Sequence, residues 1–108
     1  MKRIIIPAFG TRISPRLDFA NHIHIIQTEG KKIIDREVIQ IITHNRLNRI
    51  HQIVTLNPDV IICDGLTDMC KTEFEKDKIK VIAWVHGEID TIVESYLKGK
   101  LKEKIIKE

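Results

Sequence analysis

The sequence predicts an α/β protein with a five-stranded mixed sheet and helices on both of its faces. Isoleucine dominates an apolar content of 43%, and aromatic residues make up only 5% of the chain, a composition that favours strands. Apolar runs joined by a glycine turn come first, and strand-like runs then alternate with helix-like segments, which is typical of parallel crossovers. A chain of 108 residues is expected to form one domain spanning 1–108, burying roughly 65% of its unfolded surface.

The first half predicts three strands. The first, at 2–7, is apolar on both faces and is expected to end at Pro7, as a central strand covered on two sides would. The second and third, at 22–28 and 32–42, flank the turn Glu29, Gly30 and Lys31, so they are expected to be antiparallel neighbours.

A first helix is expected to follow, capped by Thr43 or Asn45 and ended by Asn57 and Pro58. Its apolar side chains recur at helical spacing. They are Leu47, Ile50, Ile53 and Val54.

The second half predicts two more buried strands, at 60–63 and 80–85, each followed by a helix. Thr67 is placed to cap the second helix, and Gly99 to follow the last turn of the third. A hairpin plus two right-handed crossovers most economically gives the strand order 3-2-1-4-5.

That order places the first and fourth strands side by side, at the point where the direction of winding reverses. Ligands of open α/β sheets bind outside the carboxyl ends of the strands at such a point. Three segments are therefore expected to converge there: 9–18, 63–67 and 84–87.

Sulfur and imidazole groups in these segments are candidate metal ligands. Cys63 ends a buried strand just before a helix N-terminus, which lowers the pKa of a thiol; the alternative is a small buried core residue. His86 and His22 each border the expected crevice and could bind a transition metal, or each could be an ordinary loop or strand histidine. Cys70, within a helix stripe, is expected in the core.

Guanidinium, hydroxyl and backbone groups around the same crevice suggest an anion site. Its expected members are Arg12, Ser14, Arg16, Asp64, Gly65 and Thr67. The alternatives are that Arg16 pairs with Asp18 and only holds the loop, and that Asp64 is ordinary turn chemistry.

These motifs resemble the dinitrogenase iron-molybdenum cofactor biosynthesis domain family of NifX, NafY and the C-terminal part of NifB. The matching stretches cover nearly the whole chain: IIIPAFGTRISPRLD, TEGKK, NPDVIICDG, KIKVIAWVHGEID and ESYLKGKL. The resemblance implies a ribonuclease-H-like fold and a protein that binds or carries an iron-sulfur or iron-molybdenum-type cluster as cargo. Cofactor-assembly proteins would then be its partners. Trp84 and Val85 depart from the family, which often has small residues there.

Other functional classes are weaker. A two-metal nuclease needs several carboxylates at the centre of the sheet, and the strand at 2–7 has none, so no enzymatic activity is expected. A phosphate-binding module and a protein-interaction module stay open as alternatives; in the second, an edge strand would pair, and Asp35, Arg36 and Glu37 would resist self-association.

Charge and cysteine content suggest a cytoplasmic protein. The net charge of +3 is spread over interspersed residues, so no nucleic-acid partner is expected, and no apolar run is long enough for a membrane span. Two cysteines are too few for a disulfide framework. A monomer or weak homodimer is expected, with a charged tail at 100–108.

Overall fold

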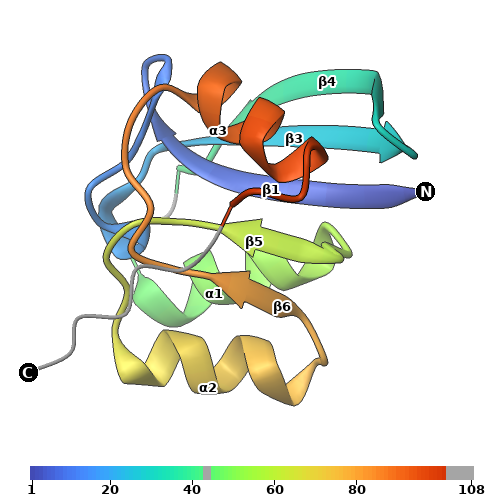
Figure 1. Ribbon diagram of the computed structural model, residues 1–108. Helices are drawn as coiled ribbons and strands as arrows, with labels where there is room; N and C mark the ends of the chain where they lie inside the picture. Colours follow the sequence, from blue (N-terminus) through green and yellow to red (C-terminus); the bar gives the residue numbers. More distant parts are fainter. Residues whose placement is uncertain (43–44, 102–108) are drawn as a thin grey trace, which may run out of the picture.

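One mixed sheet forms the centre of the structure, a computed structural model that describes residues 1–42 and 45–101, without the side chains of Asp18 and Arg46. Two helices cover one face of the sheet and a third covers the other (Figure 1). The elements are, in chain order, β1 (Lys2–Phe9), β2 (Arg12–Ile13), the 3-10 helix η1 (Leu17–Phe19), β3 (His22–Glu29), β4 (Lys32–Gln40), α1 (Arg46–Thr55), β5 (Val60–Ile62), α2 (Asp68–Lys76), β6 (Lys80–Ile82) and α3 (Ile89–Leu97).

The sheet has the order β4-β3-β1-β5-β6. β3 pairs antiparallel with both β1 and β4, whereas β5 pairs parallel with β1 and with β6. This confirms the predicted order and the α/β class, while the ribonuclease-H-like assignment stays a prediction. The predicted count of five strands is wrong, because the two-residue strand β2 also pairs with β1.

Strand β2 was missed because it is only the far arm of a tight hairpin. Phe9 pairs with Arg12, so the loop is Gly10 and Thr11, with Gly10 at φ 63°. A two-residue loop that opens on a glycine with positive φ is a preferred hairpin connection, and the same arrangement at Gly30 joins β3 to β4.

Proline does not end β1, contrary to the prediction. The Pro7 carbonyl accepts a hydrogen bond from the Ser14 backbone N–H (3.0 Å), and a strand residue directs its C=O and its backbone nitrogen to the same side. The nitrogen of Pro7 therefore lies on the side away from β3, beyond the last residue paired with β5, Ile5. The pairing of β1 with β3 therefore loses no hydrogen bond at Pro7, and the strand continues to Phe9.

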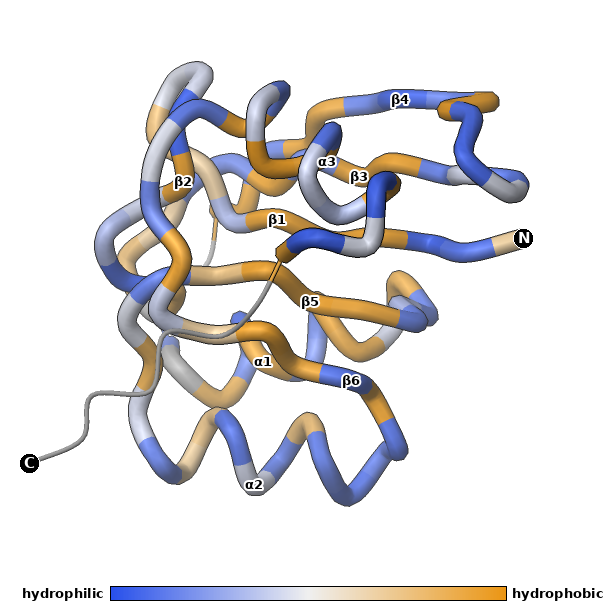
Figure 2. The backbone as a smooth tube through the Cα atoms, in the orientation of Figure 1, coloured by the Kyte–Doolittle hydropathy of each residue, from blue (hydrophilic) through white to orange (hydrophobic). Residues whose placement is uncertain are grey.

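The core lies on both faces of the sheet, and the alternation of side chains along each strand decides the face. Ile5 and Ile61 pack with Phe74 on the face covered by α1 and α2. Ile4 and Ile62 pack with α3 on the other face. Figure 2 shows the resulting apolar centre: β5 is hydrophobic, and β1 is hydrophobic beyond its hydrophilic start, as expected for strands buried on both sides.

The predicted helix caps are confirmed where the structure describes them. The Asn45 side chain accepts a hydrogen bond from the Asn48 backbone N–H (3.2 Å), and Thr67 caps α2. Gly99, with φ 71°, follows the C-cap of α3, residue Lys98. Thr43, the alternative cap, lies outside the described residues.

Three strands are shorter than predicted: β4 ends at Gln40, β5 at Ile62 and β6 at Ile82. After β6 the backbone of Trp84 takes a positive φ of 61°, which turns the chain out of the sheet. Of the predicted tail at 100–108, only Lys100 and Leu101 are described. None of the helices in the described ranges has the length and hydropathy needed to cross a bilayer.

Candidate functional site

Three loops meet at the carboxyl ends of β1, β5 and β6, as the strand order predicted. Gly65, after β5, donates its N–H to the Pro15 carbonyl (2.9 Å), and the Leu17 N–H donates to the Gly65 carbonyl (2.9 Å). The Ile13 N–H donates to the carbonyl of Gly87, after β6 (3.0 Å). The convergence is therefore held by the backbones of the loops and not only by side chains.

Gly65 is needed because the two loops approach so closely. A Cβ atom at this position would lie 2.9 Å from the Pro15 carbonyl oxygen, a backbone atom that cannot rotate away. The role of Gly65 in binding a ligand stays a prediction. Its missing side chain has a structural effect, because it lets the loop after β1 dock on the loop after β5.

A groove of about 580 Å³ opens beside this junction, between the β1–β2 hairpin and η1. Three predicted site residues line it: Ser14, Arg16 and His22. The other described lining residues are Ala8, Phe9, Gly10, Pro15, Phe19, Ala20 and Asn21. These ten residues include the basic Arg16 and no acidic residue; the side chain of Asp18, in the same loop, lies outside the described part of the structure.

Aromatic and basic side chains give the groove its chemical character. Phe9 is 78% exposed and Phe19 is 60% exposed, so both rings are accessible to a bound molecule. The Arg16 guanidinium carbon lies 4.5 Å from the centroid of the Phe19 ring, an arrangement that orients a cation over an aromatic face. The sequence reading missed both phenylalanines, although the i, i+3 spacing of Arg16 and Phe19 was a usable signal.

A buried arginine supports the groove from beneath and was also missed. Arg49, on α1, is 7% exposed. Its Nη1 donates to the Ala20 carbonyl, and its Nη2 donates to Asn21 Oδ1 at 3.1 Å. Ala20 and Asn21 line the groove, so Arg49 connects helix α1 to the groove wall.

The remaining predicted anion-site residues do not line the groove. Arg12 is exposed, with its Nε 3.9 Å from a Glu88 carboxylate oxygen. Asp64 accepts the Trp84 N–H at its backbone carbonyl (3.1 Å). The Thr67 hydroxyl accepts the Cys70 N–H (3.2 Å), so it already occupies the N-terminus of α2.

Ser14 and Asp18 were both expected to lie in the loop that carries Arg16. The Ser14 hydroxyl donates to the Arg16 carbonyl (2.9 Å) and so stabilises the turn that presents Arg16. The suggested pairing of Arg16 with Asp18 lies outside the described side chains.

The expectation that the Cys63 thiol faces the crevice is wrong. Its side chain is fully buried, in the core cluster on the α1 and α2 face. Cys63 follows Ile61 by two residues, and alternation along the strand directs both side chains to that face. Cys70 is buried in the same cluster, as predicted.

The two histidines proposed as ligands are both exposed but are not gathered with a cysteine. His22 lines the groove, whereas His86 does not. In the part of the chain that the structure describes, no group of three or more His, Cys, Asp or Glu side chains could hold a metal ion. The predicted set of Cys63, His86 and His22 therefore does not form one metal centre.

A third histidine, His24, predicts a pH dependence of stability through the pKa of its imidazole. Burial of His24 lowers the pKa of its imidazole below 6.5, and a hydrogen bond with the Gly10 backbone opposes this only in part. The folded state therefore favours the neutral ring, which stabilises the protein above the unfolded pKa. We expect the free energy of unfolding to fall as the pH drops below about 6.5, and to fall less in a His24→Gln variant, as measured by urea unfolding between pH 7.5 and 5. Equal pH dependence in the two proteins would contradict this role.

The fold and groove define a class: a small mixed α/β protein with a groove at the carboxyl ends of its strands whose described wall includes Arg16, Phe9 and Phe19. No protein-family model matches the chain, and no curated protein is similar to it in sequence. Solved structures do share the fold. The crystal structure of PH0822 superposes with a TM-score of 0.88 at 20% identity, covering 94% of this chain and 93% of that one.

Two further structures carry descriptions that bear on the class. One, from Methanocaldococcus jannaschii, is described as "a putative dinitrogenase" and matches with a TM-score of 0.78 at 19% identity over 96% of both chains. The other, from Thermotoga, is described as "a putative NifB protein" and matches with a TM-score of 0.76 at 19% identity over 100% of this chain and 99% of that one. The resemblance indicated by the sequence motifs is thereby confirmed at the level of the fold.

Proposed function

We propose that this protein is an accessory protein that binds an anionic metallocluster or its precursor as cargo, in the groove between the β1–β2 hairpin and η1. The cargo would be of the iron-sulfur or iron-molybdenum type. The proposed role is binding and delivery, without catalysis, and the partners would be proteins that assemble or receive the cluster.

One observation carries the proposal: the described wall of the groove combines Arg16 with exposed phenylalanines and contains no acidic residue. A sulfide cluster is large, negatively charged and polarisable, so it gains both from a guanidinium and from apolar ring surface. The solved structures described in nitrogenase-related terms support this choice of anion through the shared fold.

The corrected position of Cys63 changes how the cargo would be held. With the thiol in the core, the described groove offers one imidazole, that of His22, and one guanidinium, that of Arg16. Binding would therefore depend on charge and shape, with at most one ligand to iron from the described residues that line the groove. Weak ligation suits a carrier, because a cargo held by several thiolates is difficult to release.

The proposal predicts that Arg16→Gln weakens the cargo and Cys63→Ala does not. Removing one charge-assisted contact costs about 1.5 kcal/mol, which corresponds to about tenfold in affinity. The measurement is bound iron and visible absorbance after anaerobic loading with iron and sulfide. Arg36→Gln is the matched control, since it removes the same charge at an exposed residue that does not line the groove.

Two results would count against this assignment. If Arg16→Gln loads as the parent does, the groove is not the site. If the Cys63→Ala variant folds but loses the absorbance, the Cys63 thiol of the parent protein must become accessible to the cargo, and the site is in the core. Binding of inorganic phosphate with the same dependence on Arg16, and no binding of iron and sulfide, would instead support the alternative of a small-anion-binding module.

A further inference from the structure

The outer strand β4 has a long exposed edge. It is nine residues long, lies at one end of the sheet order and pairs on one side with β3. Every residue in it is exposed except Ile39, which is half-buried. An edge strand of this kind presents backbone N–H and C=O groups that can pair with another strand.

The two faces of β4 differ in chemistry. Glu37 pairs across the ladder with Ile25, and Asp35 pairs with Gln27, so both carboxylates lie on the face of the sheet that carries α1 and α2. Val38 lies on the opposite face, as the partner of His24.

The register also places Ile33 on the α3 face, opposite Thr28. The α1 and α2 face of the strand therefore carries two carboxylates at its middle, with Lys32 at its start and Ile39 near its end. The α3 face carries Ile33 and Val38 together with the polar Arg36 and Gln40. Ile33 is 40% exposed and Val38 55% exposed, so both aliphatic side chains are accessible to a partner.

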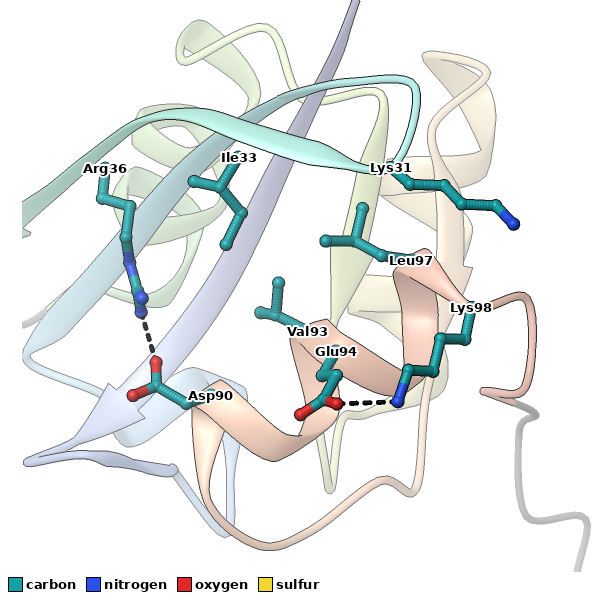
Figure 3. Close-up of a pocket in the computed structure, with 8 residues that line it drawn as sticks. All are labelled: Lys31, Ile33, Arg36, Asp90, Val93, Glu94, Leu97 and Lys98. Atoms are coloured by element: carbon teal, nitrogen blue, oxygen red, sulfur yellow. Dashed lines mark hydrogen bonds and ion pairs between the residues drawn. The ribbon is translucent and has the colours of Figure 1, made fainter.

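An apolar groove continues the aliphatic face toward α3. It has a volume of about 370 Å³, and Figure 3 shows Ile33 on β4 facing Val93 and Leu97 on α3 across it. Arg36 Nη2 and Asp90 Oδ1 form an ion pair at 2.7 Å that joins the strand to the helix. Arg36 therefore already has an acidic partner on α3, whereas Asp35 and Glu37 are exposed carboxylates at the middle of a strand that carries Lys32 at its start.

We propose that β4 binds an extended segment of another protein by strand addition, and that this segment alternates aliphatic with lysine or arginine side chains. In such a segment successive side chains point to opposite faces. The basic residues would lie beside Asp35 and Glu37, and the aliphatic residues beside Ile33 and Val38. The backbone edge would supply affinity, and the side-chain alternation specificity.

A second copy of the chain is a poorer occupant. If the β4 strands of two copies paired antiparallel about a two-fold axis, residues opposite each other would lie on the same face of the sheet. The residue at the centre of the pair would then lie opposite the same residue of the other copy. Centres at Asp35 or Glu37 place identical carboxylates together, and a centre at Arg36 places Asp35 opposite Glu37. Like charges directly opposite each other destabilise a pair, so these three registers are disfavoured. A centre at Val38 places Glu37 opposite Ile39 and avoids that repulsion, but it gains none of the opposite-charge pairs that a basic partner would supply.

The test uses the full chain and a blocked nine-residue peptide that alternates valine and lysine. We expect chemical-shift changes in two-dimensional NMR to concentrate on the backbone amides of β4 and to saturate with peptide concentration. Two control peptides separate the contributions: one has N-methyl groups on alternate residues, which remove backbone donors, and one has glutamate in place of lysine. Both are expected to bind at least about tenfold more weakly, because each loses one source of recognition.

Variants of the protein complete the test. Asp35→Lys/Glu37→Lys is expected to weaken the valine–lysine peptide by about tenfold, since two favourable cross-strand charge pairs become repulsive. Glu75→Lys/Asp77→Lys, at exposed positions on and after α2, makes the same charge change and should leave binding unchanged.

Three results would overturn the proposal: equal affinity for the N-methylated peptide, equal weakening in both double variants, or shift changes located away from β4. A concentration-dependent dimer that involves β4 and excludes the peptide would also overturn it, and would assign the edge to a second copy.

Discussion

Gly65→Ala is expected to lower the free energy of unfolding by about 2–3 kcal/mol, the upper part of the range of about 1–3 kcal/mol for forcing an extra atom into a closely packed site. The new Cβ would lie 2.9 Å from the Pro15 carbonyl oxygen, so one of the two loops must move. That movement weakens both hydrogen bonds that join them, Gly65 N–H to Pro15 and Leu17 N–H to Gly65. Urea unfolding monitored by circular dichroism measures the change.

Gly99→Ala is the matched control. Gly99 has φ 71°, and a Cβ there would have no atom within 4 Å, so only the cost of a left-handed backbone remains, about 1–2 kcal/mol. The two variants also differ in function: Gly65→Ala should weaken cargo binding in the groove, and Gly99→Ala should not. Equal cargo binding in both variants would show that the junction of the loops does not shape the groove.

Arg49→Met is expected to destabilise the protein by about 2–3 kcal/mol and to weaken cargo binding. Methionine keeps the apolar stem but leaves the Ala20 carbonyl and the Asn21 side chain without their guanidinium partner. A buried acceptor deprived of its donor costs about 1–3 kcal/mol. Urea unfolding gives the stability, and anaerobic loading with iron and sulfide gives the binding.

Arg36→Met separates this effect from the loss of a positive charge. The Arg36 side chain is 42% exposed and its partner Asp90 is 80% exposed, and an exposed ion pair is worth about 0–1 kcal/mol. If the two variants lose similar stability, the hydrogen bonds of Arg49 are not a structural support of the groove. If Arg49→Met is destabilised but binds the cargo with unchanged affinity, Arg49 supports the fold only.

Local patterns predicted most of the fold. Alternation and the glycine turn at Gly30 located the β3–β4 hairpin, and the side chains of Asn45 and Thr67 located the starts of two helices. These features depend on residues close in sequence, so they can be read without knowledge of distant contacts. The handedness of crossovers then predicted which strands are neighbours, and hence which loops converge.

The same reasoning was less successful for Pro7 and for the β1–β2 hairpin. Whether a proline ends a strand depends on which side of it needs a hydrogen-bond donor, and that is decided by the neighbouring strands. The hairpin at Gly10 was readable in principle, but its second arm has only two residues and gives no periodic signal.

The sequence by itself determined the order of the strands, the positions of the caps and the end of the sheet where loops of different strands meet. Tertiary structure alone decided which side chains reach that end. Cys63 ends an apolar run in a sheet covered on both faces, so composition cannot show whether its thiol points into the core or out at the rim. Packing directs it inward with Ile61 and leaves Arg16, Phe19 and His22 around the groove, because a side chain's direction follows from its register in the sheet, which is set by residues far away in the chain.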